Sequence, residues 1–492
     1  MNNSCRPSAK KYLPWVGLTL AVVLSACQPS IPPAPRNLVL ICIDTVRFDS
    51  FFHASISDEL NPWIERAQVY ENAQAPSPWT IPSVVSLFTG QYPIEHGAGR
   101  FEQEVANLDT DLPSPLHDDA MTLAETLDAH YFRTGAFVSH PFFQAKLGLT
   151  QGFQEVHYRR GWWRDVDMFW KWADRIEAPH RFFGYLHFME AHHRHTREQE
   201  EMSGTLEEYD AHTRQDLVVR AQPGACKDSE SHRCLQNMVY NASVLELRKA
   251  IATVLDDLAE RNLIDETLVV LYSDHGEEFW DHEMEQIQLN EDPRGIFGIG
   301  HGQSLYQELL HVPLLIWHPG IKGKRHQDLV SLVDVLPSLV AWLELENADI
   351  EVSGKWLPPL RKSFFSFSRD RQVWSSGMAY GPEKISSRTG NMKSIFSLRD
   401  DRFEFFDLAV DPDEHTPIDD DSLIMAFDTL TGDYLELEGR NHYAAGQLDS
   451  SQMKPSQLDD LKAIGYLQGI ESESQADEEP MPQGDEAGGE KE

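Results

Sequence analysis

Two carboxylates and one imidazole stand directly after apolar stretches of the sequence. Asp44 ends "NLVLICID", while Asp274 and His275 follow "TLVVLY" in "YSDHGEE", where Gly276 allows the chain to bend. Carboxylate oxygens and an imidazole nitrogen form a mixed ligand set that suits Mn²⁺ or Zn²⁺ better than Ca²⁺, which prefers more oxygens. Singly, Asp44 could cap a turn and His275 could be a hydrogen-bonded polar residue. Together, at strand ends, they favour a divalent metal site.

A single threonine raises a second chemical question. "SPWTIPSVVSLFTG" places Thr80 just ahead of Pro82 and an apolar run, where a helix is expected to begin. Threonine caps helices well, so an N-cap is one interpretation of Thr80. The other interpretation is a nucleophile held over a metal, and these fourteen residues leave both open.

The elements that must position these groups alternate between helical patterns and buried strands. Apolar runs occur at 37–44, 131–140, 181–193 and 266–278, and helical segments such as "VDMFWKWADRI" separate them. This alternation predicts an α/β fold with a largely parallel central sheet. Ligands of open α/β sheets bind beyond the carboxyl ends of the strands. We therefore expect His140 and His192 to converge with the acidic groups at one edge.

The chain is expected to divide into five parts. Residues 27–36 form a proline-rich linker, and residues 37–370 form the catalytic domain. The short strands in 391–414 indicate a small antiparallel subdomain over 371–468, and the acidic, aromatic-free 469–492 is expected to be disordered. The first 26 residues have a basic start and a short apolar run, which is typical of a signal peptide.

The ending "LSAC" resembles a bacterial lipobox, which implies cleavage before Cys27 and lipid attachment to its thiol. Gln28 follows, so we expect a lipid-anchored protein of the bacterial envelope, on the periplasmic face of the outer membrane; an ordinary secretory signal or an uncleaved anchor is the alternative. Export makes a disulfide between Cys226 and Cys234 plausible, with two free thiols as the alternative.

Net charge excludes one class of partner. The formal charge of -37 gives a surface that repels nucleic acid and anionic lipid headgroups. An anionic substrate would need a local basic pocket to overcome that field.

Seven stretches in a fixed order resemble the sulfatase family of the alkaline phosphatase superfamily: "NLVLICIDTVRFDS", "SPWTIPSVVSLFTGQYPIEHGA", "LVVLYSDHGEEF", "GIGHGQSLYQELLHVPLLIWHPG", "SLVDVLPSL", "FEFFDLAVDPDE" and "LKAIGYL". The resemblance implies a mixed sheet flanked by helices with a small C-terminal antiparallel subdomain. Sulfatases mature a Cys-x-Pro-Ser-Arg cysteine to formylglycine, but the aligned positions here hold Thr80 and Val84 in place of the cysteine and the arginine. Formylglycine cannot form, and the threonine resembles the nucleophile of the superfamily's phosphoester hydrolases and transferases.

The resemblance also assigns the remaining site residues. It implies a divalent metal held by Asp44, Thr80, Asp274 and His275, a pattern of the manganese- or zinc-using branches, with His301 and His192 as catalytic histidines. Glu190 and Ala191 replace the family's Asp-Pro, so His193 could take the place of His192. His140 and Arg47 are candidate contacts of an anionic ester, although Arg47 could instead brace Asp49. The substrate is expected to be an anionic ester, such as one carried by an envelope glycan or a lipid headgroup. A sulfatase that works without formylglycine and a non-catalytic binding protein are the alternatives.

Overall fold

The computed structural model describes residues 34–101, 112–144, 146–193, 206–207, 211–219, 231–345, 348, 350–359, 371–420, 422–440 and 456–457. The expected leader, the lipidated Cys27, most of the linker, Cys226 and the acidic tail lie outside these residues, so those expectations stay predictions. Across the part of the chain that is described, no helix combines the length and the apolar character that a membrane crossing demands.

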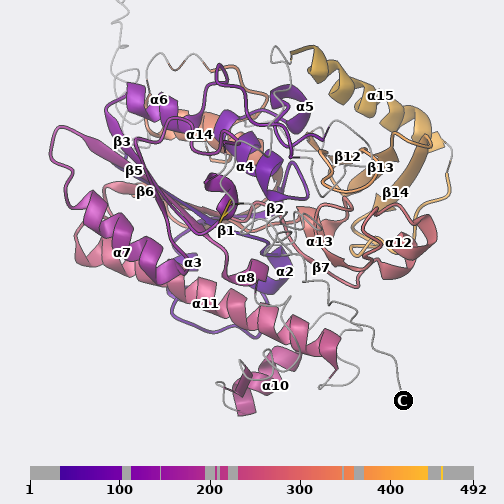
Figure 1. The fold of residues 1–492 in the computed structure, drawn as a ribbon, viewed down its shortest axis with the longest axis horizontal. Coiled ribbons are helices and arrows are strands. Elements are labelled where there is room, and N and C mark those ends of the chain that lie inside the picture. The colour runs from indigo at the N-terminus through magenta and orange to yellow at the C-terminus, as the bar shows by residue number, and fades with distance from the viewer. Residues whose placement is uncertain are drawn as a thin grey trace, which may run out of the picture.

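The core of the fold is a mixed eight-stranded sheet (Figure 1). Its strands lie in the order β10 (Lys324–Ser331), β2 (Gln68–Gln74), β9 (Leu314–Trp317), β6 (Thr267–Tyr272), β1 (Asn37–Ile43), β5 (Arg181–Phe188), β3 (Phe132–Val138) and β4 (Glu155–Tyr158). Every strand is parallel to the others except β9, which runs antiparallel to β2 and β6. The expectation of a largely parallel sheet is confirmed, and all the parallel strands end at one edge.

Both faces of this sheet are buried, which explains why its strands are apolar at every position. Leu38, Leu40 and Cys42 of β1 face one apolar core, and Val39 and Ile41 face the other. The first core is covered by α4 (Thr80–Thr89), α6 (Leu123–Ala129) and α14 (Val335–Trp342), and the second by α3 (Asn61–Ile64), α7 (Trp162–Ala173) and α11 (His232–Glu260). The helices lie on opposite sides of the sheet in Figure 1.

Shorter elements complete the catalytic part. A two-stranded ribbon pairs β7 (Glu278–Phe279) with β8 (Ile299–Gly300). Among the described residues, the other helical segments of the catalytic part are α2 (Phe48–Phe51), α5 (Pro93–His96), η1 (Pro141–Phe143), α8 (Glu190–His193), α10 (Ala211–Val219), α12 (Glu283–Leu289), α13 (Gln307–Leu310) and η3 (Leu332–Asp334), whereas η5 (Leu437–Arg440) belongs to the C-terminal part.

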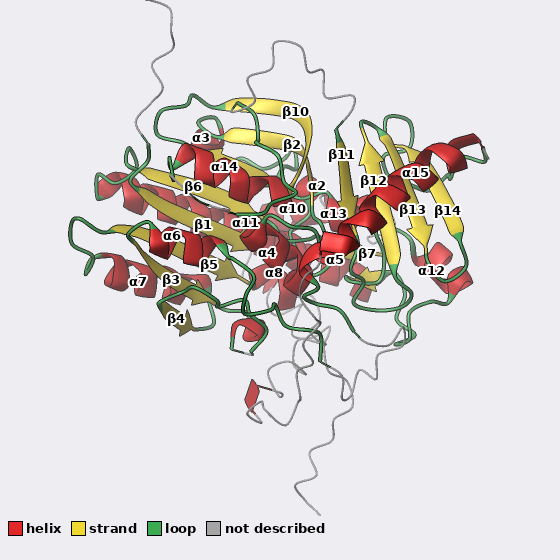
Figure 2. Cartoon of the chain, turned by 90° about the horizontal axis from the view of Figure 1, so that it is seen from above, coloured by secondary structure: helices red, strands yellow, loops and turns green. Residues whose placement is uncertain are grey.

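A second, antiparallel sheet follows, as the sequence predicts (Figure 2). It consists of β11 (Gln372–Ser375), β12 (Lys384–Thr389), β13 (Met392–Ser397) and β14 (Arg402–Asp407), with α15 (Ser422–Glu436) packed against it. The two parts are joined by the buried Lys393–Glu414 ion pair of the second part, 2.6 Å long. The Lys393 ammonium donates to the Leu305 carbonyl at 2.7 Å, and Glu414 accepts from the Gln307 amide at 2.5 Å. The antiparallel sheet therefore docks on the catalytic part through a specific polar contact.

Candidate active site

The predicted metal ligands converge at the carboxyl edge of the sheet. Strands β1 and β6 are neighbours, with Cys42 level with Tyr272, so Asp44 and the Asp274–His275 pair leave the sheet side by side. One ligand atom from each of the three lies within 4.8 Å of the others, and all three residues are fully buried. The sheet topology therefore assembles the set that the sequence predicts.

Thr80 joins this cluster from α4, one of the helices that cover the first apolar core. Trp79 occupies the N-cap position of α4, so Thr80 is the first helical residue and does not cap the helix. Its hydroxyl lies 3.2 Å from Nε2 of His275. Ser83, one turn later, donates from its hydroxyl to the Asp274 carbonyl at 2.6 Å. The cap interpretation is wrong for this threonine, whose side chain faces the carboxylates.

Backbone contacts fix which nitrogen of His275 faces the cluster. Its Nδ1 lies 2.9 Å from the Gly276 carbonyl, which can only accept, so Nδ1 carries the proton. The lone pair of Nε2 then points toward Thr80, 3.6 Å from Oδ1 of Asp44 and 3.5 Å from Oδ2 of Asp274. A neutral imidazole in this tautomer is a metal ligand or a proton acceptor.

The carboxylates show that a cation fits between these groups. Oδ1 of Asp44 and Oδ2 of Asp274 are buried and make no hydrogen bond among the described residues. These are the same two oxygens that approach His275 Nε2. Burying unpaired carboxylate oxygens is costly unless they are hydrogen-bonded or coordinate a metal. The donor set therefore suits a divalent metal.

The electrostatics of Asp44 also favour a bound cation. Burial raises the pKa of Asp44 well above its usual range, and the charges of Asp274 and Glu277 raise it further, against an opposing contribution from His275. A cation placed between the carboxylates would reverse this effect, because it stabilises both charged forms.

His187 is part of this site, and the sequence analysis missed it. This β5 residue lies level with Cys42, and its Nε2 is 2.9 Å from Oδ2 of Asp44. Burial lowers its pKa to about 4, so the ring is neutral and donates from Nε2. Its Nδ1 accepts from the Tyr185 hydroxyl at 2.8 Å, which in turn lies 3.2 Å from the Tyr272 hydroxyl. The available signal was the alternation of polar Tyr185 and His187 inside an otherwise apolar strand.

His301 reaches the site through the β7–β8 ribbon, which pairs Glu278 with Gly300. Its ring centroid lies 4.5 Å from that of His275, and its Nδ1 lies 3.2 Å from Oε1 of Glu277. Burial and, to a smaller extent, the charge of Arg294 lower the pKa of His301 to about 3. The ring is therefore neutral at physiological pH.

Two further histidines complete a ring of imidazoles around the carboxylates. His192 on α8 is buried, with its ring 5.0 Å from that of His301 and 6.0 Å from that of His140. His140 accepts at Nδ1 from the Phe142 amide, and its Nε2 lies 3.7 Å from Asp44 Oδ2. His192 thus points into the site, while the side chain of His193 lies outside the described residues.

Arg47 does not point at the cluster as a free cation. Its guanidinium pairs with Asp49 and Asp281, each at 2.9 Å, and also donates to the Glu277 carbonyl at 3.2 Å. This geometry favours bracing over contact with an anionic ester. Val84, where sulfatases have arginine, is fully buried in the apolar core under α4.

The cysteines separate into two kinds. Cys42 is a buried free thiol of β1, as its apolar surroundings predict. Cys234, near the start of α11, is disulfide-bonded. Its expected partner Cys226 lies outside the described residues, so the pairing stays a prediction.

Comparison with known proteins places this geometry in a family. The sulfatase family model matches residues 36–345, which is more than half of the chain, and the chain therefore belongs to the sulfatase family. Its fold is that of a sulfatase superfamily hydrolase, an enzyme class that acts on anionic esters with a divalent metal, and the described residues contain a candidate ligand group for such a metal.

Individual relatives are more distant. Arylsulfatase K of Rattus norvegicus is 30% identical over 193 residues, covering 36% of this chain and 31% of the relative. Choline-sulfatase of Rhizobium meliloti (strain 1021) is 25% identical over 213 residues, covering 43% of this chain and 38% of the relative. The matches thus span about a third of the length of these curated relatives. Phosphonate monoester hydrolase of Agrobacterium radiobacter shares the fold, with a TM-score of 0.59 at 16% identity over 86% of this chain and 100% of that chain.

Proposed function

We propose that this sulfatase-family hydrolase acts on phosphoesters of the bacterial envelope and uses Thr80 as its nucleophile, either as a hydrolase or as a transferase to an alcohol. One observation carries the proposal. The Thr80 hydroxyl lies 3.2 Å from His275 Nε2, beside two buried carboxylate oxygens that have no hydrogen-bond partner among the described residues. This is where a hydroxyl would be activated, and it is not where a helix cap would sit.

Asp44, Asp274 and His275, with the Thr80 hydroxyl, would hold the metal, and Mn²⁺ or Zn²⁺ fits this mixed oxygen and nitrogen set better than Ca²⁺. When bound, the metal would lower the proton affinity of the hydroxyl and polarise the ester oxygens. The side chains of Thr80 and Asp44 are fully buried, so the attack takes place away from bulk water.

The chain's own groups account for the remaining roles. Thr80 is the first residue of α4, so the free amides of the first helical turn lie beside the attacking oxygen and favour developing negative charge. Glu277 accepts from Nδ1–H of the neutral His301, which leaves Nε2 of that ring to accept a proton from the nucleophile or from the incoming water or alcohol. His187 holds Asp44 in place from behind through its Nε2–H.

The nucleophile type favours phosphorus over sulfur. A formylglycine hydrate can expel sulfate by returning to the aldehyde, but a threonine ester has no such exit and must be cleaved at its central atom. A phosphoryl intermediate suits that step, because metal and histidines can neutralise its larger charge while water or an alcohol enters. One relative is named as a choline-sulfatase, so sulfate esters are the competing candidate substrates.

Thr80 variants test the proposal against a matched control. Thr80→Ala should lower kcat/KM on aryl phosphates and phosphodiesters by on the order of a thousandfold or more, and Thr80→Ser should keep part of the activity because the hydroxyl survives. Thr89→Ala, at the other end of α4, removes a hydroxyl that donates to the Val85 carbonyl and accepts from the Gln91 amide, away from the cluster, and should leave turnover near normal.

Intact-protein mass spectrometry of quenched reactions should detect a phosphoryl adduct on Thr80 and none in Thr80→Ala. Faster turnover of aryl sulfates than of matched aryl phosphates would assign the site to sulfate esters. Binding of esters without turnover under any added metal would assign the chain to a non-catalytic role. Near-normal turnover by Thr80→Ala would refute the nucleophile.

A further inference from the structure

The edge of the large sheet opposite the active site collects unpaired cations. Because all strands except β9 are parallel, their amino ends share one edge. Six basic residues lie at or just before those ends, and none of them has an ion pair with a described residue: Arg36, Arg66, Arg133, Arg181, Lys322 and Lys324. We call these six residues the amino-edge cations.

Three of the amino-edge cations gather around His180. Arg36 donates to the His180 carbonyl at 3.4 Å, and the Arg133 guanidinium lies 3.4 Å from Nε2 of the same residue. Arg181 stacks over the Phe132 ring at 4.2 Å, and its pKa is lowered by burial and by the charge of Arg36. Gathering like charges without a carboxylate partner is unfavourable in the free protein, so a partner anion would relieve the repulsion.

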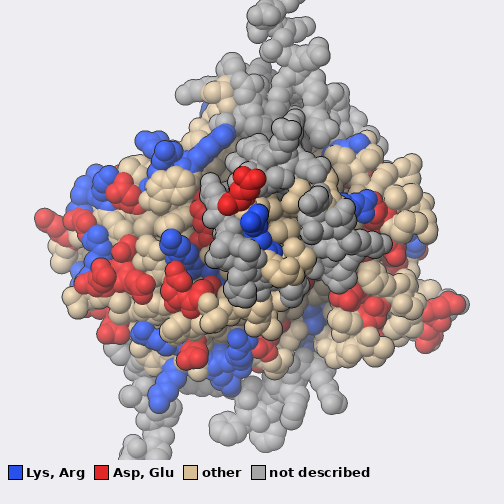
Figure 3. All heavy atoms as spheres, turned by 90° about the horizontal axis from the view of Figure 1, so that it is seen from below, with Lys and Arg blue, Asp and Glu red and all other residues tan. Residues whose placement is uncertain are grey.

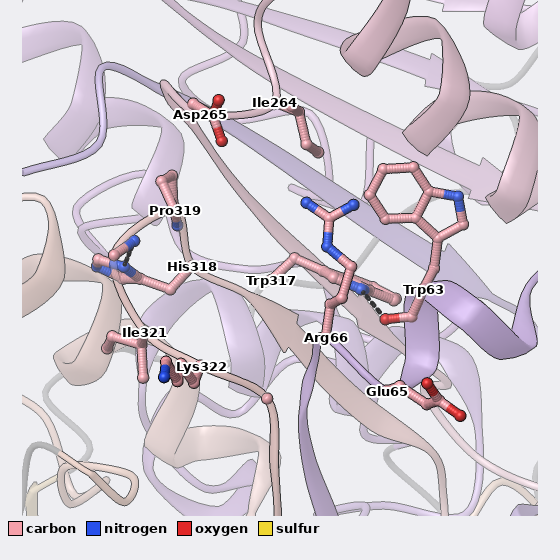
Figure 4. A pocket seen from close by; sticks show the side chains of 12 residues that line it. Trp63, Glu65, Arg66, Ile264, Asp265, Trp317, His318, Pro319, Ile321 and Lys322 are labelled. Atoms are coloured by element: carbon pink, nitrogen blue, oxygen red, sulfur yellow. Dashed lines mark hydrogen bonds between the residues drawn. The ribbon is translucent and has the colours of Figure 1, made fainter.

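The other part of this edge contains a cavity of about 490 Å³ (Figure 4). Arg66 and Lys322 line it, and the Arg66 guanidinium lies 4.3 Å from the centre of the Trp63 ring. Asp265 also lines the cavity, whereas the Glu65 carboxylate points away from the guanidinium in Figure 4. Stacked arginine and a nearby lysine are donors suited to a phosphate group.

From this arrangement we propose that the amino edge is a docking surface for anionic phospholipid headgroups. The position of the lipobox supports a membrane as the occupant. Cys27, the expected site of lipid attachment, precedes Arg36 by nine residues, which span at most roughly 30 Å when extended. The edge is therefore the part of the fold that the anchor holds nearest to the bilayer.

The net charge of -37 does not oppose this surface as strongly as it first suggests. Charges separated by more than about 8–10 Å are largely screened at physiological salt, so the charges at this edge govern contact there. The six cations at the edge stand against Asp265 and Glu266, which directly precede β6. Acidic and basic side chains are interspersed on the face seen in Figure 3, and nine of the acidic residues stand in the tail, 469–492. An exposed aromatic residue, Tyr131, lies beside Arg133 and is 74% exposed, as interfacial tyrosines are.

The orientation has a consequence for the substrate. The seven residues of β1 separate the amino edge from Asp44 by roughly 23 Å at about 3.3 Å per residue. With the amino edge on the bilayer, the active site faces away from it. This geometry favours a periplasmic ester, such as one on a glycan, over a headgroup in the supporting leaflet, and this last step rests on the proposed function.

Vesicle flotation of the full chain with Cys27→Ala, which cannot be acylated, isolates the surface from the anchor. It should bind vesicles of phosphatidylglycerol mixed with phosphatidylcholine, bind pure phosphatidylcholine far less, and be released by 0.5 M salt, a value chosen because screening shortens to roughly 4 Å there. Replacing Arg36, Arg133 and Arg181 by Ala should weaken binding by about 100-fold, the scale expected for three basic residues at an anionic surface.

A control variant removes the same charge elsewhere. It replaces Arg159, Arg160 and Arg164 by Ala. These residues follow β4 or lie at the start of α7, at the carboxyl edge, so vesicle binding should be unchanged. If the Arg181 change disturbs folding, the double variant Arg36→Ala with Arg133→Ala alters only exposed side chains and should still weaken binding by about 30-fold.

Equal losses in the two triple variants would show a general charge effect and overturn the proposal. Equal binding to both kinds of vesicle, or no binding to phosphatidylglycerol, would do the same. None of these readouts depends on turnover, so failure of the docking surface and failure of the proposed function can be told apart.

Discussion

Removing the metal should destabilise the protein in a way that depends on two specific oxygens. The perturbation is chelation of the wild-type protein. Asp44 Oδ1 and Asp274 Oδ2 then remain buried, unpaired and mutually repelling. A ligand present at about 100 times its Kd stabilises the folded state by about 2.7 kcal/mol. For a chain of this length, each kcal/mol corresponds to roughly 1–2 °C in Tm, so chelation should lower Tm by roughly 3–5 °C.

The pH dependence of the chelated protein provides a second signature. Burial and Asp274 raise the pKa of Asp44 in the folded state, so the metal-free folded protein binds a proton that the unfolded chain has released. Its stability is therefore fully present below the unfolded pKa of about 3.9 and falls as pH rises toward the raised folded value. With metal bound, both carboxylates are charged and coordinated, and this slope should largely disappear.

Differential scanning calorimetry with and without chelator, at several pH values, measures both effects. Asp274→Asn should abolish the metal-dependent shift and make the metal-free protein more stable than metal-free wild type, because one of the repelling charges is gone. Asp165→Asn is the control: this carboxyl is also buried, with its pKa raised to about 8 by burial, but it bonds to Ser139 outside the cluster. A wild-type Tm indifferent to chelation, or an equal shift in Asp274→Asn, would refute the reasoning.

Three further outcomes follow from buried polar contacts. His187→Phe removes the donor behind the metal-site carboxylate and should weaken metal affinity by about 10–100-fold, as measured by competition with a chromogenic chelator; unchanged affinity would contradict its positioning role. Lys393→Met leaves Glu414 buried and unpaired, and should lower the free energy of unfolding by about 3–5 kcal/mol in denaturant titrations. Glu308 raises the pKa of His282 to about 10 against its burial, so the stabilisation from this pair should be complete below about pH 6.5 and lost as pH rises through 10. A His282→Gln deficit that does not shrink at high pH would count against that pair.

The local sequence was sufficient to predict much of the fold and part of the candidate site. Continuous apolar runs ending in Asp44 and Asp274 predict buried parallel strands because both faces of such a sheet are covered. Those strands place the two acids at one edge, and the structure confirms that they meet. The short strands in 391–414 likewise predict the antiparallel sheet, because its hairpin is formed by residues adjacent in the chain.

Other features depended on contacts between residues far apart in the chain. The direction of β9 and the pairing of β7 with β8, which brings His301 beside His275, are set by packing rather than by local pattern. The role of Thr80 was open in the sequence because a cap and a nucleophile require the same residue type. Trp79 takes the N-cap position, which excludes the cap, and the threonine hydroxyl lies beside His275. The nucleophile stays a prediction.

Two residues show most clearly what the local sequence could not predict. His187 lies inside an apolar strand, and only the neighbouring position of β1 and β5 reveals that it faces Asp44. Arg47 has the charge to bind an anionic ester, but Asp281, more than 230 residues away in sequence, engages its guanidinium. Sequence determined which chemical groups are present and which ends of strands carry them. The tertiary structure decided which of those groups face one another, because that depends on strand order and on partners that no local pattern encodes.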